Sequence, residues 1–327
     1  MSNKFRFLCN RLFRIRSNFK LPPVTVSRSF SGQPKTSAIP VTVGFSLFTW
    51  LGFQKKLSSE DELIHTIKHC VLFIQRGEHE KAEQLLHVAL RQAQQLRHEL
   101  GITYIYDVMA NLALEREQLD KAKQLFVSVA QRIMADGATE DDPRVVHISS
   151  KLARISHLKK EYTTAQLGYD WCLEKLRAAM QYDADDATKK LLAMTEDWYG
   201  RLFIDCDQNE QGLNLMISSL KWMREVEDVE KEHIVIQLND IGTVCDRLGK
   251  ADESISYFKE AIELGKNLNM DDIGAMYVNL GRAYLKKSLI DEARKSCGYG
   301  WKLGSMSKND DIKREAESCL QEVKKHS

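Results

Sequence analysis

A small residue recurs six times along most of the chain, each time inside the second helix of a predicted helix pair. The six are Ala82, Ala122, Ala165, Gly212, Ser254 and Ala293, at intervals of 40, 43, 47, 42 and 39 residues. When this residue is numbered 20 in each unit, position 8 is also small: Cys70, Ala110, Ala153, Gly200, Gly242 and Gly281. Small side chains at both positions let two antiparallel helices approach closely. The recurrence therefore predicts a stack of paired helices over residues 60–327.

Two more positions keep the same register. Position 24 is mostly a large apolar residue, namely Leu86, Phe126, Tyr169, Met216, Phe258 and Cys297, and position 27 is mostly small, namely Ala89, Val129, Cys172, Ser219, Ala261 and Gly300. The unit VNLGRAYLKKSLIDEARKS from Val278 resembles the tetratricopeptide (TPR) pattern, with Leu280, Gly281, Tyr284 and Ala293 in register. We predict an all-α fold, a right-handed TPR solenoid of about six helix-turn-helix repeats. A polar amphipathic helix over 308–325 is expected to cap its open end.

The intervals exceed the 34 residues usual for this repeat, and we expect the extra residues in the connections between repeats. Gly137 is expected to end one helix, with Asp142 and Pro143 as N-cap and first-turn residue of the next. The acidic stretch MQYDADDATKK after Ala179 is expected to be a second insertion. Ser59, with Glu62 three residues later, predicts a capping box at the start of the first repeat.

The amino-terminal segment differs from the rest in charge. Its first 59 residues contain no Asp or Glu and ten Lys or Arg, whereas residues 60–327 hold 37 basic and 46 acidic side chains, a net charge of −9. Basic residues alternating with apolar ones before Pro22 are typical of a mitochondrial presequence, which we predict over 1–30. A basic arm that binds nucleic acid or an anionic membrane is the alternative.

A linker over 31–37 leads to the uncharged stretch 38–53, which precedes Lys55 and Lys56. It is short for a membrane span, which takes about 20 apolar residues. We predict a single transmembrane or membrane-associated helix, with a buried or interfacial helix as the alternative. The TPR repeat domain is expected over 60–327.

The first helices of TPR repeats line a concave groove, so the groove can be read from the register. The candidate peptide-binding residues are Tyr104, Asp107, Asn111, Lys151, Arg154, Trp198, Arg201, Asn239, Asp240, Asn279 and Arg282. Arginine, aromatic and asparagine side chains suit an extended protein segment. The set departs from the lysine and asparagine clamp of chaperone-binding TPR domains, and the charge of −9 disfavours nucleic acid as a partner.

Residue patterns for catalysis or cofactor binding are weak. Seven cysteines without a C-x-x-C pair predict free thiols, several at packing positions. His65 and His69 lie four residues apart but lack the glutamate of H-E-x-x-H, and the glycines of GYGWKLG follow no strand pattern. We therefore name no catalytic residue, no metal ligand and no cofactor, and expect a protein that is not an enzyme.

Three consecutive segments carry a family resemblance. They are GEHEKAEQLLHVALRQAQQL from Gly77, ITYIYDVMANLALEREQLDKAKQLF from Ile102 and KLARISHLKKEYTTAQLGYDWCLEKL from Lys151. In order, they resemble the mitochondrial family of tetratricopeptide repeat protein nineteen, most strongly over residues 60–180. The resemblance implies an inner-membrane protein that associates with respiratory complex III and helps to clear fragments of its Rieske iron-sulfur subunit. A soluble matrix adaptor or assembly chaperone with other protein clients is the alternative.

Overall fold

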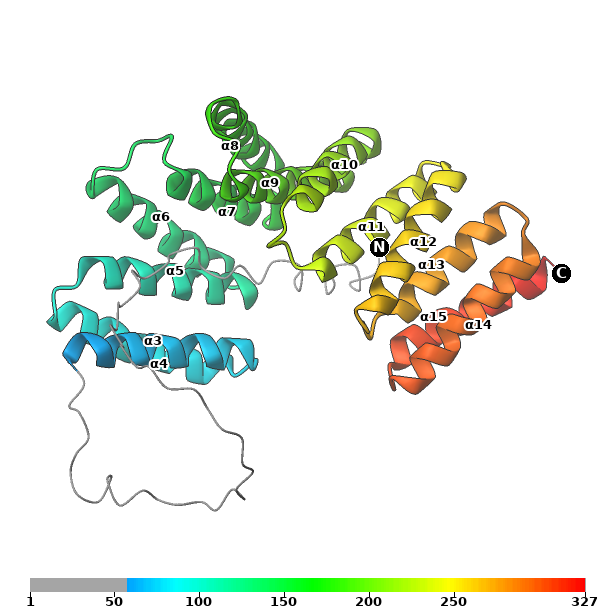
Figure 1. Cartoon of the computed structure of the whole chain (residues 1–327), viewed down its shortest axis with the longest axis horizontal. Coiled ribbons are helices and arrows are strands. Elements are labelled where there is room, and N and C mark those ends of the chain that lie inside the picture. Colours follow the sequence, from blue (N-terminus) through cyan, green and yellow to red (C-terminus); the bar gives the residue numbers. More distant parts are fainter. Residues whose placement is uncertain (1–57, 327) are drawn as a thin grey trace, which may run out of the picture. The chain divides into compact units, whose positions relative to one another are not determined.

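The computed structural model describes residues 58–326, so the expectations for segments 1–30, 31–37 and 38–53 lie outside the described residues. The described chain consists of thirteen helices without a strand, α3 to α15 (Figure 1). It divides into two compact units between Arg132 and Ile133. None of the described helices is both long and apolar enough to cross a membrane.

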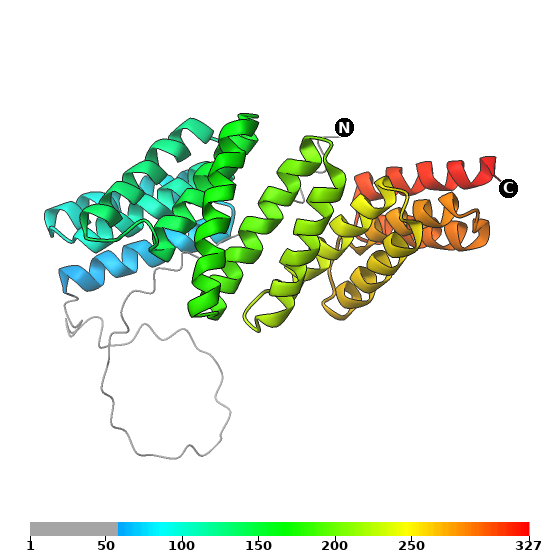
Figure 2. The same ribbon diagram turned by 90° about the horizontal axis from the view of Figure 1, so that it is seen from above.

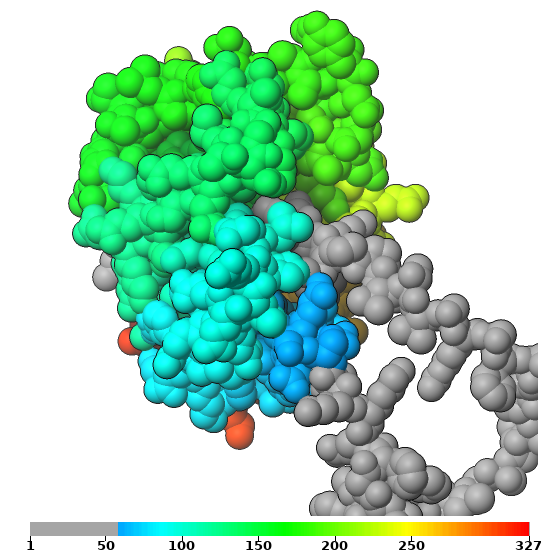
Figure 3. Space-filling model, turned by 90° about the vertical axis from the view of Figure 1, so that its left-hand side faces the viewer, coloured from blue at the N-terminus to red at the C-terminus, as the bar shows by residue number. Residues whose placement is uncertain are grey.

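The first unit contains two helix pairs. They are α3 (Ser59–Gln75) with α4 (His79–Gln95) and α5 (Glu99–Glu115) with α6 (Leu119–Ala135), the last three residues of α6 belonging to the second unit. A cluster of buried side chains, including Leu63, Leu86 and Ile105, fills the space between α3, α4 and α5. Figure 3 shows part of the surface of these helices, coloured from blue at α3 to blue-green at α6.

The second unit continues the alternation with nine helices (Figure 2). They are α7 (Pro143–Leu158), α8 (Tyr162–Tyr182), α9 (Asp186–Asp205), α10 (Asn209–Glu225), α11 (Lys231–Arg247), α12 (Ala251–Asn267), α13 (Ile273–Lys286), α14 (Ile290–Met306) and α15 (Asp310–Lys325). Each helix packs on the next, and α7, α11 and α13 also contact α9, α13 and α15, respectively. Contacts to the next helix and the next but one are the arrangement expected for a TPR solenoid.

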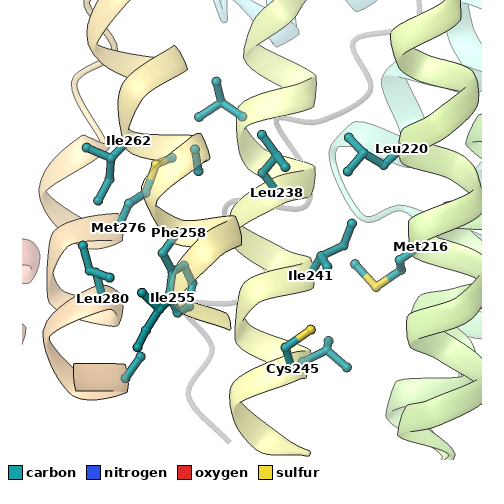
Figure 4. Close-up of a cluster of buried hydrophobic side chains, with 14 of the residues drawn as sticks. Met216, Leu220, Leu238, Ile241, Cys245, Ile255, Phe258, Ile262, Met276 and Leu280 are labelled. Carbon is teal, nitrogen blue, oxygen red and sulfur yellow. The ribbon is translucent and has the colours of Figure 1, made fainter. Parts of the chain in front are cut away.

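The four packing positions are buried in every repeat, which confirms the predicted register. The backbones of α9 and α10 approach closely, since a Cβ added to Gly212 would lie 2.6 Å from the carbonyl oxygen of Gly200. A Cβ on Gly242 would lie 2.8 Å from the ring of Phe258 at position 24. Figure 4 shows that ring among buried side chains from α10 to α13. Position 8 is small because the partner helix occupies the space that a side chain would need.

The extra residues of each repeat lie mostly in the helices, contrary to the expectation for the connections. α3 to α6 have 17 residues each, and short turns such as 76–78 join them. The acidic stretch after Ala179 is no looped insertion, since α8 extends to Tyr182 and α9 starts at Asp186. Nothing between Ala179 and Tyr182 breaks a helix. The connection at 136–142 is a true insertion, with Gly137 at φ 95° and Asp142 capping Arg144 N–H, as predicted.

The two ends of the repeat array differ from expectation in detail. The capping box of α3 uses Ser58 and Asp61 rather than Ser59 and Glu62, so the predicted start was one residue late. The capping helix is confirmed as α15. Cys297 of α14 and Cys319 of α15 form a disulfide, and the expectation that all cysteines are free thiols was wrong for this pair. Cys70, Cys172, Cys206 and Cys245 are free.

Candidate protein-binding surface

The first helices of the second unit are joined by side-chain hydrogen bonds that we call the polar ladder. Its best-connected residue is Arg201 of α9, at 9% exposure. The Arg201 guanidinium donates to Asp197 Oδ2 over 2.9 Å within α9 and to Asp240 Oδ2 over 2.8 Å in α11. Burial raises the pKa of the Asp240 carboxyl, and the positive charge of Arg201 opposes this rise. Two buried carboxylates therefore depend on one guanidinium.

The ladder continues from α11 to α13 through two asparagines. Asn279 Nδ2 donates to Asn239 Oδ1 over 3.0 Å, and Asn239 lies beside Asp240 in the sequence. Closer to the carboxyl ends of the two helices, Lys286 Nζ donates to Asp246 Oδ2 over 2.7 Å. Each asparagine amide offers both a donor and an acceptor, so one pair leaves further hydrogen-bonding capacity on both side chains.

Arg282 of α13 carries the ladder to the capping helix. Its Nη2 lies 3.1 Å from Glu315 Oε2 and 3.5 Å from Glu322 Oε1, both in α15. The Arg282 side chain is 32% exposed, in contrast to Arg201. Arg282 thus forms partly solvated ion pairs with the two glutamates of α15, and solvated ion pairs contribute little to stability.

At the other end, His157 joins α7 to α9. Its Nδ1 accepts from Arg154 Nη1 over 2.9 Å, and its Nε2 donates to Asp205 Oδ2 over 3.0 Å. Burial lowers the pKa of His157, while the hydrogen bond to Asp205 opposes the fall. The imidazole is therefore neutral near pH 7. Its proton is on Nε2, because the Arg154 guanidinium can only donate and Nδ1 must accept. Ser150 and Thr195 add a second link between these helices, at 3.0 Å.

The predicted groove residues thus divide into two sets. Arg201, Asn239 and Asp240 are joined by the ladder and nearly buried, and Lys151 and Trp198 are also buried, at 1% and 6% exposure. Arg154 of α7 and Asn279 and Arg282 of α13 are half-buried, so this set lies on two first helices. In the first unit, Tyr104 and Asp107 are buried, and the half-buried Asn111 donates to the carbonyl oxygen of Asp107 over 2.8 Å.

Several ladder residues were not among the predicted groove residues. Asp197, His157 and Asp205 stand at positions 5, 12 and 13 of their repeats, on the first helices that were expected to line the groove, so the register could have found them. Glu315 and Glu322 lie in the capping helix, outside any repeat position, and the sequence held no signal for their contact with Arg282.

A second kind of buried carboxylate lies on α9, next to Asp197 in the sequence. Glu196 is 4% exposed, and its Oε1 is 3.8 Å from Arg177 Nη2. Burial raises the pKa of Glu196. Ser218 and Trp222 oppose this rise as nearby hydrogen-bonding groups, but in the described part of the chain Glu196 Oε2 makes no well-aligned hydrogen bond. Unlike the ladder carboxylates, this one is incompletely paired.

The described residues contain no group of three His, Cys, Asp or Glu side chains placed to hold a metal ion. The rings of His65 and His69 are 4.9 Å apart on α3. The side chains that converge on the first helices are instead hydrogen-bond donors and acceptors in a row, which can bind another chain along its length.

The repeat register and this row of polar side chains define a TPR protein. The family model of the tetratricopeptide repeat matches residues 238–267, which span most of α11 and all of α12. Among solved structures, a signal-transduction ATPase with a TPR sensor from Pyrococcus horikoshii aligns with a TM-score of 0.60 at 15% identity, covering 80% of this chain and 37% of that chain. The apo form of RapI aligns with a TM-score of 0.58 at 12% identity, covering 78% and 80%, respectively. At such identities these similarities establish the fold alone.

Curated relatives are more specific. The mitochondrial tetratricopeptide repeat protein 19 homologue of Drosophila melanogaster is 37% identical over 273 residues, covering 83% of this chain and 74% of the relative. Mitochondrial tetratricopeptide repeat protein 19 of Homo sapiens is 28% identical over 280 residues, covering 82% and 74%. The chain belongs to the family of mitochondrial tetratricopeptide repeat protein 19, as the resemblance over residues 60–180 predicted. It is a TPR-repeat protein of mitochondria.

Proposed function

We propose that this chain is a non-enzymatic scaffold of the mitochondrial inner membrane that binds respiratory complex III. In this role it supports assembly or maintenance of the complex, including clearance of Rieske iron-sulfur protein fragments. Membership of the family supports the choice of partner. The observation that carries the scaffold role is the row of polar side chains along the first helices of the second unit, of which Arg154 on α7 and Asn279 and Arg282 on α13 are half-buried.

Within that row, we assign contact with the partner to Arg154, Asn279 and Arg282. They retain solvent-accessible surface, whereas Arg201, Asn239 and Asp240 are nearly buried and hydrogen-bonded within the ladder. Asparagine amides suit the backbone of an extended segment, and arginine suits its carboxylates. The buried set then holds neighbouring first helices in register, so that the half-buried set presents a fixed spacing to the partner.

Attachment to the membrane is assigned to the uncharged stretch 38–53. A short helix with Trp50 and the lysines 55 and 56 at its end has the residues favoured at a membrane interface. Resistance of the chain to alkaline carbonate extraction tests this assignment. Release by carbonate, together with normal complex III activity after deletion of the chain, would favour the soluble matrix adaptor instead.

Co-migration with complex III on native gels in mild detergent tests the partner. We expect the full chain to co-migrate, and Arg282→Glu to reduce the co-migrating fraction about tenfold because it reverses a half-exposed charge facing the partner. Lys302→Glu is the matched control, since Lys302 is exposed on α14, a second helix. A wild-type chain that migrates apart from complex III contradicts the proposal.

The non-enzymatic role has its own test. The purified chain, incubated with a Rieske fragment, is expected to leave the fragment intact, while mitochondria that lack the chain accumulate such fragments. Cleavage of the fragment by the purified chain would contradict the non-enzymatic role and indicate that the chain is a protease.

A further inference from the structure

The last repeat departs from the others where its second helix meets the end of the array. Position 24 is Leu, Phe, Tyr, Met and Phe in the first five repeats and Cys297 in the sixth. In place of a large apolar side chain, Cys297 offers a covalent bond to Cys319, 22 residues further on, with the two Cα atoms 5.9 Å apart. That separation is within the ordinary range for a disulfide.

The capping helix has few large side chains with which to hold its place. Its buried residues are Ile312, Ala316, Cys319 and Val323, and only two of them are larger than cysteine. Burial of small side chains removes little apolar surface from water, so it stabilises the docked helix only weakly. A disulfide that closes the loop between α14 and α15 limits how far α15 can move when it undocks.

The same contact supports the proposed binding surface. Glu315 and Glu322 of α15 both pair with Arg282 of α13. They remain beside Arg282 only while α15 is docked, so the disulfide keeps one end of the polar ladder in place.

Access to the two sulfur atoms determines when the bond can form. Cys297 and Cys319 are both fully buried among the side chains of α13, α14 and α15. A disulfide-carrying enzyme cannot reach them once α15 is docked, and neither can glutathione. The bond must therefore form as the last helix docks, and it is shielded from thiol exchange afterwards.

Disulfides persist in oxidising compartments and are rare where glutathione and thioredoxin keep thiols reduced. We propose that Cys297 and Cys319 are oxidised in the intermembrane space during folding, and that the repeats face that side of the inner membrane rather than the matrix. In this step the two chain thiols are oxidised to one disulfide while the disulfide of a thiol oxidoreductase is reduced to a dithiol, which takes both protons. The choice of side rests on the proposed attachment to the inner membrane.

The remaining described cysteines do not compete for this bond. Cys70, Cys172 and Cys245 are buried, on α3, α8 and α11. Cys206 is half-buried, and burial together with the charges of Asp205 and Asp207 raises the pKa of its thiol. A higher pKa leaves less thiolate to attack a disulfide, so Cys206 is a poor entry point for exchange.

Thiol trapping in the full chain tests the bond. Mitochondria are treated with N-ethylmaleimide, and the denatured chain is then labelled with a maleimide polymer, with and without prior reduction. We expect reduction to add two polymer adducts to the wild type and to Cys206→Ser, and none to Cys319→Ser or Cys297→Ser. Equal labelling of the wild type with and without reduction would overturn the inference.

Protease treatment tests which side of the inner membrane the repeats face. The repeats are expected to be digested once the outer membrane is ruptured, and survival in intact mitoplasts would contradict the inference. A chain that carries the disulfide yet migrates apart from complex III contradicts only the proposed function. A chain that co-migrates with free thiols at 297 and 319 contradicts only the inference drawn here from the disulfide.

Discussion

The seam between the two helices of a repeat and the centre of the polar ladder between first helices are both buried, but they are built by opposite means. The seam uses size: Gly200 and Gly212 leave room for backbone contact, and Phe258 fills the space that Gly242 leaves. The ladder uses pairing, with Arg201 and Asp240 depending on each other. A seam residue thus makes its contacts within its own repeat, whereas a ladder residue makes its contacts with the first helix of a neighbouring repeat.

The largest effect is expected from breaking the ladder at its centre. Arg201→Leu leaves Asp197 and Asp240 buried near each other without their common cation, and it is expected to cost about 3–5 kcal/mol of unfolding free energy. Urea unfolding followed by circular dichroism measures this. Adding Asp240→Asn to Arg201→Leu should recover part of the loss, because it removes one of the stranded charges. A loss below about 1 kcal/mol for Arg201→Leu would mean that the ladder is not a stabilising contact.

A methyl group is expected to disrupt the seam. In Gly212→Ala the new Cβ meets the backbone of α9 at 2.6 Å, so the helices must separate, at a cost of about 1–3 kcal/mol. Gly298→Ala is the matched control, since a Cβ there has no neighbour within 4 Å in the described structure and alanine favours the helix by up to about 1 kcal/mol. Thermal unfolding should therefore move in opposite directions for the two variants. A shift in the same direction would contradict the tight seam.

Glu196 tests what happens when a buried carboxylate lacks the pairing of the ladder. The raised pKa of Glu196 means that the folded state disfavours its ionised form. The resulting loss of unfolding free energy is absent below the pKa of the unfolded state and is complete once the pH has risen through the pKa of the folded state. Glu196→Gln removes that penalty and is expected to stabilise the fold by about 1 kcal/mol at neutral pH. The advantage of the variant should shrink near pH 4. An advantage that is constant with pH would show that charge is not the cause.

The smallest effect is expected at the turns, which belong to neither region. Arg97, in the turn after α4, has φ 52°, a left-handed conformation that is energetically unfavourable for residues with a Cβ. The equivalent position in the turn after α3 is Gly77, at φ 73°. Arg97→Gly is expected to raise stability by up to about 1 kcal/mol, and Gly77→Ala to lower it by a similar amount. Chemical denaturation of both variants checks the pair. Destabilisation by Arg97→Gly would mean that its side chain matters more than its backbone.

The sequence was sufficient for the seam because its evidence is local. Six recurring small residues show where the helices touch, and the contact at each of them, such as Ala122 or Gly281, lies within its own repeat. The same locality predicted Gly137 and Asp142 at the one true insertion. The start of α3 was displaced by one residue because Ser58 and Ser59 can both act as caps.

The ladder and the disulfide needed the folded chain. Arg201 and Asp240 were both predicted to line the groove, but their pairing depends on the rotation of α9 against α11. The separation of 39 residues does not reveal that rotation. Cys319 lies in a capping helix that has no repeat position, so nothing in the register aligned it with Cys297. The acidic stretch after Ala179 looked like a loop by charge, yet no glycine or proline ends α8 before Tyr182.

Hydrogen exchange of the full chain, free and bound to purified complex III, tests most directly whether the first helices form the binding surface. Binding is expected to slow exchange in α7 and α13, which carry Arg154, Asn279 and Arg282, and in the capping helix, which carries the partners of Arg282. The second helices α12 and α14 serve as the internal reference and should remain unchanged. Slowed exchange confined to α12 and α14 would contradict a binding surface on the first helices.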